Sequence, residues 1–322
     1  MKAIRYRAYG PPDVLELQEV GKPEVGDDEV LIRVHAASVN PGDWHLMRGS
    51  PYIFRAMAGM TRPKAHVLGF DLAGQVEAVG KDVTRFQPGD EVYGVCKGAF
   101  AEYVTVPEGG PVARKPAGLT YEEAAAVPTA GLTALQGVRD KAQVGGRRVL
   151  VNGASGGVGT FAVQLAKVFG AEVTAVCSGR NAELVRSIGA DRVIDYTKED
   201  FTRSAQKYDL ILDNIANRSL AACRRVLAPR GTFVHNSGVG GGPWFGVLGR
   251  IIRLLVTSLF VRQKLVSLMT KENAGDLVLL GRMLESRDIA PVIDRTYPLS
   301  DVPEAVGYLE QGHARGKVVI TI

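Results

Sequence analysis

The stretch Val149-Leu-Val-Asn-Gly-Ala-Ser-Gly-Gly-Val-Gly-Thr-Phe-Ala162 decides the fold of this chain. It opens with a short aliphatic run typical of a buried strand and passes through a glycine-rich corner into apolar residues at helical spacing. A strand, a tight glycine turn and a helix form the unit that holds the pyrophosphate of a dinucleotide. The turn lets the backbone approach the phosphates, and the helix N-terminus offers free N–H groups. The stretch therefore predicts a dinucleotide-binding domain.

The residues after this unit indicate which dinucleotide is bound. A second strand is expected over residues 172–178, about twenty residues past the turn. An Asp or Glu at its end would grip the ribose 2′-hydroxyl of NAD, but the chain reads Ser178-Gly-Arg180. A hydroxyl and a guanidinium suit a 2′-phosphate, so we predict NADPH as the cofactor. A structural turn with no ligand is the alternative.

Length and composition set the broad class of protein. A chain of 322 residues is too long for one ordinary core, so two domains are expected. The net charge of +5 comes without a block of Lys and Arg, so no nucleic-acid partner is expected. Cys96, Cys177 and Cys223 are scattered and odd in number, which argues against a disulfide framework. The N-terminus reads as a strand, not a signal peptide, and we expect a cytoplasmic protein.

The order of elements predicts two kinds of architecture. Residues 1–120 are rich in strand and turn patterns and predict a compact, barrel-like β domain, which the strands within 288–322 complete. Residues 121–287 alternate strands with helices and predict a doubly wound parallel sheet. The expected strands of this sheet cover residues 148–153, 172–178, 192–196, 208–214 and 231–237. The fold class is therefore α/β.

Several motifs together resemble one superfamily. They are Ala36-Ala-Ser-Val-Asn-Pro-Gly-Asp43, Leu68-Gly-Phe-Asp-Leu-Ala-Gly74, Pro88-Gly-Asp-Glu-Val-Tyr-Gly94, Gly98-Ala-Phe-Ala-Glu-Tyr103, Val127-Pro-Thr-Ala-Gly-Leu-Thr-Ala134, the glycine corner and Gly316-Lys-Val-Val-Ile320. The chain resembles the medium-chain dehydrogenase/reductase superfamily, within its quinone oxidoreductase-like branch. The resemblance covers nearly the whole chain except roughly 240–263. It implies a GroES-like β-rich domain, a Rossmann domain, and an active site in the cleft between them.

The zinc-dependent members of that superfamily provide the first comparison. Catalytic zinc needs three protein ligands of Cys, His or carboxylate type. Where those relatives carry the first Cys this chain has Asn40, and where they carry His it has Phe70. The third-ligand region, 129–133, has no thiol, and the five histidines are scattered. We therefore predict no metal.

The resemblance then implies hydride transfer from NADPH to a quinone or an α,β-unsaturated carbonyl, whose oxygen takes up the developing charge. Asn40 and Tyr52 are the candidate catalytic donors, with His45 and Arg48 as weaker ones, and Asp43 is expected to orient the loop. Asn40 could instead satisfy its own turn, and Tyr52 could pack on the domain surface. Two other functions stay open: an NADPH-binding sensor or scaffold, and a reductase of simple aldehydes or ketones.

The resemblance also implies a cofactor-binding set that surrounds the nicotinamide, the pyrophosphate and the 2′-phosphate. Its members are Thr129, Gly153, Ser155, Gly156, Gly157, Val158, Gly159, Ser178, Arg180, Tyr196 and Lys317.

Residues 241–269 form an apolar stretch interrupted by basic residues, and its part near 241–263 reads as an insertion in the Rossmann domain. It is too interrupted to span a membrane easily. It could be a cleft lid, a contact with a second subunit of a homodimer, a peripheral membrane contact, or plain core. Its last part should form a strand of the sheet.

Overall fold

The computed structural model describes residues 1–52, 55, 58–64, 66–140, 146–236 and 246–322. The chain divides into two compact units. Unit 1 consists of residues 1–132, 271–287 and 291–322, and unit 2 of residues 133–270 and 288–290. Within the described residues, no helix combines the length and the apolar character needed to cross a membrane.

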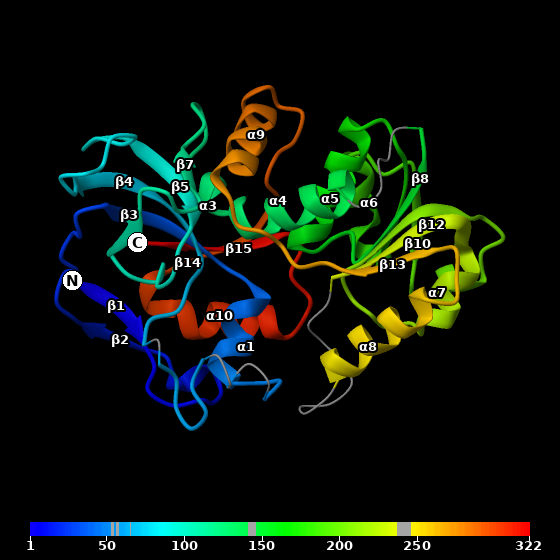
Figure 1. The fold of residues 1–322 in the computed structure, drawn as a ribbon, viewed down its shortest axis with the longest axis horizontal. Coiled ribbons are helices and arrows are strands. Elements are labelled where there is room, and N and C mark those ends of the chain that lie inside the picture. Colours follow the sequence, from blue (N-terminus) through cyan, green and yellow to red (C-terminus); the bar gives the residue numbers. More distant parts are fainter. Residues whose placement is uncertain (53–54, 56–57, 65, 141–145, 237–245) are drawn as a thin grey trace. The chain divides into compact units, whose positions relative to one another are not determined.

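Unit 1 is built around the long strand β3 (Glu29–Val39), which pairs with three other strands. The sheet has the order β14-β15-β3-β4-β5-β7, with β6 also paired to β3 (Figure 1). Its pairs are antiparallel except for the parallel pair β14–β15. The remaining strands of unit 1 are β1 (Lys2–Arg5), β2 (Glu16–Glu19), β4 (Asp71–Val79), β5 (Glu91–Val95), β6 (Tyr103–Pro107), β7 (Val112–Arg114), β14 (Ile293–Pro298) and β15 (Lys317–Thr321).

The β-branched and aliphatic residues of these strands form the core of unit 1. Ile4, Ile32, Leu72 and Phe100 are fully buried in it. The helices associated with this unit are α1 (Pro41–Arg48), α3 (Tyr121–Ala125), α4 (Pro128–Leu135, which continues into unit 2), α9 (Ala274–Glu285) and α10 (Val302–Glu310), with 3-10 turns at Pro12–Val14 and Leu299–Asp301.

Unit 2 contains a six-stranded sheet in the order β10-β9-β8-β11-β12-β13, and all five of its strand pairs are parallel. This is the doubly wound order of a Rossmann fold. The strands are β8 (Arg148–Asn152), β9 (Glu172–Cys177), β10 (Arg192–Asp195), β11 (Tyr208–Asp213), β12 (Leu227–His235) and β13 (Lys264–Ser267). The expected α/β class, with a β-rich GroES-like part and a Rossmann sheet, is confirmed.

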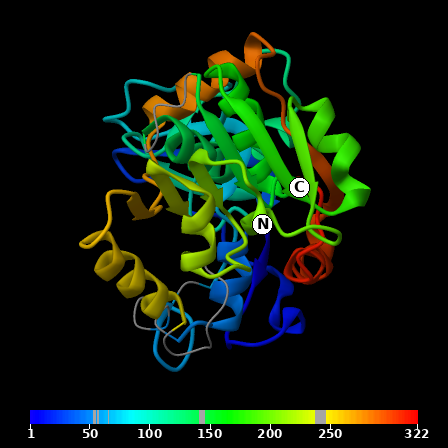
Figure 2. The same ribbon diagram turned by 90° about the vertical axis from the view of Figure 1, so that its right-hand side faces the viewer.

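Helices between these strands cover the sheet of unit 2 (Figure 2). They are α5 (Gly157–Val168), α6 (Ala182–Ser187), α7 (Leu220–Val226) and α8 (Gly246–Ser258), with a π-helical turn at Gln136–Asp140 and 3-10 turns at Gly179–Asn181 and Phe201–Arg203. The segment expected to be an apolar insertion therefore contains the helix α8 and then strand β13. Residues 241–245 of that segment lie outside the described residues.

The boundaries of the units differ from those expected from the sequence. Residues 121–132 and 271–287 were expected in the nucleotide-binding domain, but they belong to unit 1. The physical reason is that α9 packs on β7 and the buried Tyr93 hydroxyl donates to the Leu277 carbonyl over 2.6 Å. Gly281 also fits against Pro116, where an added methyl group would lie 3.3 Å from the ring.

Candidate functional site

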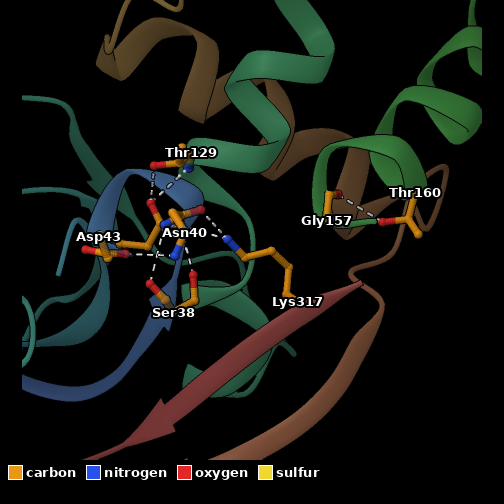
Figure 3. Close-up of polar contacts among 8 residues, drawn as sticks. Ser38, Asn40, Asp43, Thr129, Gly157, Thr160 and Lys317 are labelled. Carbon is orange, nitrogen blue, oxygen red and sulfur yellow. Dashed lines mark hydrogen bonds and ion pairs between the residues drawn. The ribbon is translucent and has the colours of Figure 1, made fainter. Parts of the chain in front are cut away.

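A buried carboxylate, Asp71 at the start of β4, is the centre of a polar network in unit 1. Figure 3 labels the residues that donate to it, which are Ser38, Asn40, Thr129 and Lys317. Its Oδ2 accepts hydrogen bonds from the Ser38 hydroxyl at 2.8 Å, the Asn40 amide at 2.9 Å and the Lys317 ammonium at 3.2 Å. Its Oδ1 accepts from the Thr129 backbone N–H at 3.0 Å and the Thr129 hydroxyl at 2.5 Å. The carboxylate is therefore fully hydrogen-bonded although water does not reach it.

Strand register brings these residues together from distant parts of the chain. Ser38 lies opposite Asp71 in the β3–β4 pair, and Val39 lies opposite Val318 in the β15–β3 pair. Lys317 therefore enters beside Asn40, and its ammonium donates to the Asn40 Oδ1 over 2.6 Å. Lys317 is only 3% exposed, so Asp71 and the Asn40 amide oxygen stabilise its ammonium group in place of water.

Asn40 is the N-cap residue of α1. Asp43, in the first turn of this helix, links it by hydrogen bonds to the segment before β4. Asp43 accepts the Asn40 backbone N–H at 2.7 Å and the Gly69 N–H at 3.1 Å. The prediction that Asp43 orients the loop is thereby confirmed. Complete burial is the main reason that the Asp43 pKa is raised from 3.8 to about 7, and the negative charge of Asp71 adds to it. The Asn40 side chain faces the Asp71 network.

The other candidates from this loop have structural partners. The His45 Nδ1–H donates to the Ser50 carbonyl over 2.8 Å, and burial lowers the His45 pKa. Arg48 forms a two-pronged ion pair with Glu310, at 2.7 and 2.8 Å. These contacts give His45 and Arg48 structural roles in the loop and in the packing of α1 on α10.

Tyr52 lies in a stack of two tyrosines and one arginine. The Arg55 guanidinium lies 4.7 Å from the centre of the Tyr52 ring and 4.6 Å from that of Tyr9. The Tyr9 hydroxyl donates to the Gly59 carbonyl over 2.7 Å. The Arg55 guanidinium contacts the face of the Tyr52 ring. The direction in which the Tyr52 hydroxyl points depends on the loop that carries the residue.

In unit 2, the glycine corner between β8 and α5 has the geometry of an anion-binding turn. Gly153 has a φ of +81°, which side chains rarely adopt. A methyl group on Gly159 would lie 2.1 Å from the Gly153 carbonyl oxygen, so the helix and the turn approach too closely for any side chain there. A methyl group on Gly156 would instead have only that oxygen near it, at 3.6 Å. The space above Gly156, at the N-terminus of α5, therefore fits a phosphate.

The loop after β9 lies beside this corner and contains the residues expected to meet a 2′-phosphate. Ser178 is half-buried and Arg180 is exposed, as is Tyr196 after β10. Asn181, which is 5% exposed, donates from its amide to the Ser155 hydroxyl over 2.9 Å. This bond joins the two loops that would hold the pyrophosphate and the 2′-phosphate.

A carboxylate near this loop comes from the neighbouring strand. Asp195, at the end of β10, accepts hydrogen bonds from the Thr197 hydroxyl at 2.8 Å and the Thr197 N–H at 3.0 Å. These bonds, with one from the Gly179 N–H, lower the Asp195 pKa. A methyl group on Gly179 would lie 2.5 Å from this carboxylate, so any side chain at that position would displace the carboxylate.

Three residues of these sites were not recognised from the sequence as site residues, for different reasons. Asp71 lies inside a quoted motif without a role, and its role follows from the register of β4 against β3. Asn181 has no motif of its own. Asp195 lies on a different strand from the one where a ribose-binding carboxylate was sought, and its signal would have been its position at the end of the adjacent parallel strand.

A metal ion in unit 1 would need Cys, His or carboxylate ligands. Phe70 has no ligating atom, Asn40 is bonded to Asp71 and Lys317, and Cys96 is buried, which raises its pKa. Among the described residues, no group of three His, Cys, Asp or Glu side chains is arranged to hold a metal ion. The side chains at this position are suited to hydrogen bonding.

Two family profiles match the chain. Residues 26–117 match the family described as alcohol dehydrogenase GroES-like domain, and residues 188–320 match the one described as zinc-binding dehydrogenase.

Curated relatives and solved structures match over almost the full length. The chain is 39% identical to 2-methylene-furan-3-one reductase of Solanum lycopersicum, over 99% of this chain and 79% of the relative. It is 37% identical to NADPH-dependent alkenal/one oxidoreductase, chloroplastic, of Arabidopsis thaliana, with the same coverage. A quinone oxidoreductase from Coxiella burnetii superimposes with a TM-score of 0.89 at 32% identity, over 100% of this chain and 99% of that one.

Proposed function

Because the chain belongs to the medium-chain dehydrogenase/reductase superfamily, in its zinc-independent quinone oxidoreductase-like branch, it is an oxidoreductase, and we propose that it uses NADPH to reduce a quinone or an α,β-unsaturated carbonyl. The observation that carries this proposal is the donor set around Asp71. It supplies amide, hydroxyl and ammonium groups where zinc-dependent relatives have metal ligands. This network holds Asn40 in place, and hydrogen-bond donors such as the second Asn40 N–H and the Tyr52 hydroxyl would stabilise the charge that develops on a conjugated carbonyl oxygen.

The cofactor-binding residues of unit 2 fit NADPH. We assign the pyrophosphate to the open space above Gly156, with Ser155, Gly157 and Val158 around it. The 2′-phosphate is assigned to Ser178 and Arg180, with Tyr196 beside them. The Asp195 carboxylate near this position is engaged by Thr197 and by a backbone N–H. When bound, NADPH supplies the hydride.

The residues of unit 1 would hold the substrate oxygen. We assign the main donor role to the Tyr52 hydroxyl. The Asn40 side-chain amide donates one short hydrogen bond to Asp71 and one long hydrogen bond of 3.4 Å to the Ser38 carbonyl. The N–H that makes the long bond can therefore turn to a substrate. Lys317 and Thr129 keep the Asp71 carboxylate in place and contribute to the nicotinamide side of the site.

The first experiment follows NADPH oxidation against matched panels of quinones and enones, with NADH as a control. Turnover with a clear preference for NADPH supports the proposal and identifies the substrate class. NADPH deuterated at C4 should leave deuterium on the β-carbon of a reduced enone. Saturable NADPH binding without turnover would refute the enzyme proposal in favour of a sensor or scaffold. Turnover of simple aldehydes or ketones alone would favour the third function.

The donor role of Tyr52 has its own test, with a matched control in the same stack. Tyr52→Phe should lower kcat by about a hundredfold with little change in KM, because it removes a donor used mainly in the transition state. Tyr9→Phe removes a hydroxyl bonded to Gly59 and should leave kcat near that of the wild type. Equal effects of the two substitutions would contradict the assignment.

We also propose that the protein is a homodimer and acts in the cytoplasm. Strand β13 lies at the edge of the sheet in unit 2, and an edge strand can pair with a second copy. Cys96, Cys177 and Cys223 are free and buried, which suits a reducing compartment. Sedimentation equilibrium measures the first point, and a monomer at micromolar concentration would refute it.

A further inference from the structure

The basic charge of this chain is concentrated in one stretch. Residues 214–271 contain nine Arg and Lys residues and no Asp or Glu. The whole chain has a net charge of +5, so the remaining residues carry −4. The stretch begins directly after β11 and includes α7, β12, α8 and β13 of unit 2. This part of unit 2 therefore attracts anionic partners.

Helix α8 turns an apolar face to the solvent. Ile252, Leu255 and Val256 are 52%, 61% and 51% exposed, and Leu259 and Phe260 just beyond the helix are 79% and 81% exposed. Positions 252, 255, 256 and 259 follow the spacing that places side chains on one side of a helix.

The opposite side of α8 is the one that packs on unit 2. Leu254 is 4% exposed and belongs to the core of this unit. Both views show α8 at the periphery of unit 2 (Figures 1 and 2), where it packs against β13. A contiguous apolar patch on a surface helix marks an interaction site, because burying such side chains is favourable.

Cationic side chains lie directly beside this apolar face. A shallow groove at the C-terminal end of α8 is lined by Phe260 together with the exposed Arg225 and Arg262. Arg253 is exposed on the helix itself. Apolar side chains next to guanidinium groups are the combination that binds the interface of an anionic bilayer.

We propose that the α8 surface, defined as the exposed apolar side chains at 252, 255, 256, 259 and 260 with Arg225, Arg253 and Arg262, docks on a lipid bilayer that contains anionic headgroups. The apolar side chains enter the boundary between headgroups and acyl chains, and the arginines contact the lipid phosphates. A second copy of the chain fits less well, since pairing this surface with itself would bring like charges together. Leu259 and Phe260 protrude, which favours insertion into lipid over a fit to a protein groove.

This docking is independent of the reaction proposed above. If the reduction of quinones or enones is also confirmed, the bilayer becomes a source of substrate, because apolar members of both classes partition into lipid.

The test is co-sedimentation of the full chain with vesicles of phosphatidylcholine alone or of equal parts phosphatidylcholine and phosphatidylglycerol. The wild type should sediment with the anionic vesicles, and high salt should weaken binding. Leu259→Gln/Phe260→Ser should lower the partition coefficient by at least about tenfold, since the burial of one large apolar side chain alone corresponds to that factor. NADPH binding by this variant should be unchanged, which shows that it is folded.

Two control variants carry matched changes elsewhere. Val278→Gln replaces another exposed apolar residue, which is 44% exposed on α9, and Lys81→Glu reverses an exposed charge. Both should bind vesicles like the wild type. Absence of binding to anionic vesicles, or equal loss in the controls, would overturn the proposal. A changed oligomeric state of the α8 variant without vesicle binding would assign the surface to a second copy. Binding to an acidic protein in place of vesicles would also refute it.

Discussion

Removing the Lys317 ammonium should reveal how far unit 1 depends on the buried ion pair with Asp71. Lys317→Met keeps the length of the side chain and removes its charge. Breaking a buried pair costs about 3–5 kcal/mol, because the remaining charge is left in a medium of low polarity. Asp71 retains four donors, from Ser38, Asn40 and Thr129, so we expect the lower limit of about 3 kcal/mol.

The same reasoning gives a larger loss for Asp71→Asn. This change removes the negative charge that compensates the Lys317 ammonium, which is 3% exposed, and leaves it with neutral acceptors such as the Asn40 amide oxygen. The expected loss is about 5 kcal/mol. The double variant Lys317→Met/Asp71→Asn buries no charge at these two positions, so its loss should be smaller than the sum of the two by about 2 kcal/mol.

Thermal unfolding measures these differences. For a unit of this size each kcal/mol corresponds to about 2–4 °C, so Lys317→Met should lower Tm by about 6–12 °C. Lys81→Met is the matched control, because its ion pair with Asp27 is exposed on both sides, at 70% and 69%, and Tm should not change measurably. A small effect of Lys317→Met, or strictly additive losses in the double variant, would refute the role given to this network.

Three further predictions concern the cofactor site and the buried acid. Arg180→Glu should weaken NADPH binding by about a hundredfold and NADH binding little, as measured by fluorescence titration, and equal weakening of both would contradict the 2′-phosphate assignment. Gly156→Ala should leave Tm unchanged but weaken NADPH binding, whereas Gly159→Ala should lower Tm, because only the second methyl group collides with backbone. The Asp43 pKa is raised to about 7 in the folded state, so between about pH 4 and 7 the folded protein binds more protons than the unfolded chain and stability falls as pH rises. Asp43→Asn should abolish this fall of up to about 4 kcal/mol, and parallel Tm profiles of the two proteins from pH 5 to 8 would refute it.

Local patterns in the sequence were sufficient for the fold of unit 2. The strand at 149–151, the glycine corner and the following helix are adjacent in the chain, so their periodicity and turn chemistry are visible without any tertiary contact. The carboxyl ends of successive parallel strands then place the cofactor residues at one edge of the sheet. The expected strands at 148–153 and 208–214 differ from β8 and β11 by one residue at the end.

The polar network of unit 1 could not be predicted in the same way. Asn40 and Lys317 are separated by 277 positions, and their contact depends on the register of β15 against β3. A shift of one residue would turn Lys317 to the other face of the strand. The exposed face of α8 is a second example, because periodicity shows that a helix has an apolar side but not whether that side meets the core or the solvent.

The position of Lys317 has a consequence for synthesis on the ribosome. Unit 2 is almost continuous in sequence and has all its strands by residue 267, so it can fold while the rest of the chain is still being made. Strand β3 is synthesised far earlier, but its partner β15 is synthesised only after all of unit 2. Until then Asp71 lacks its counter-charge and β3 has an unpaired edge. The part of the chain around β3 must therefore stay soluble until β15 has been synthesised, and a chain truncated before residue 317 should be a substrate for chaperones.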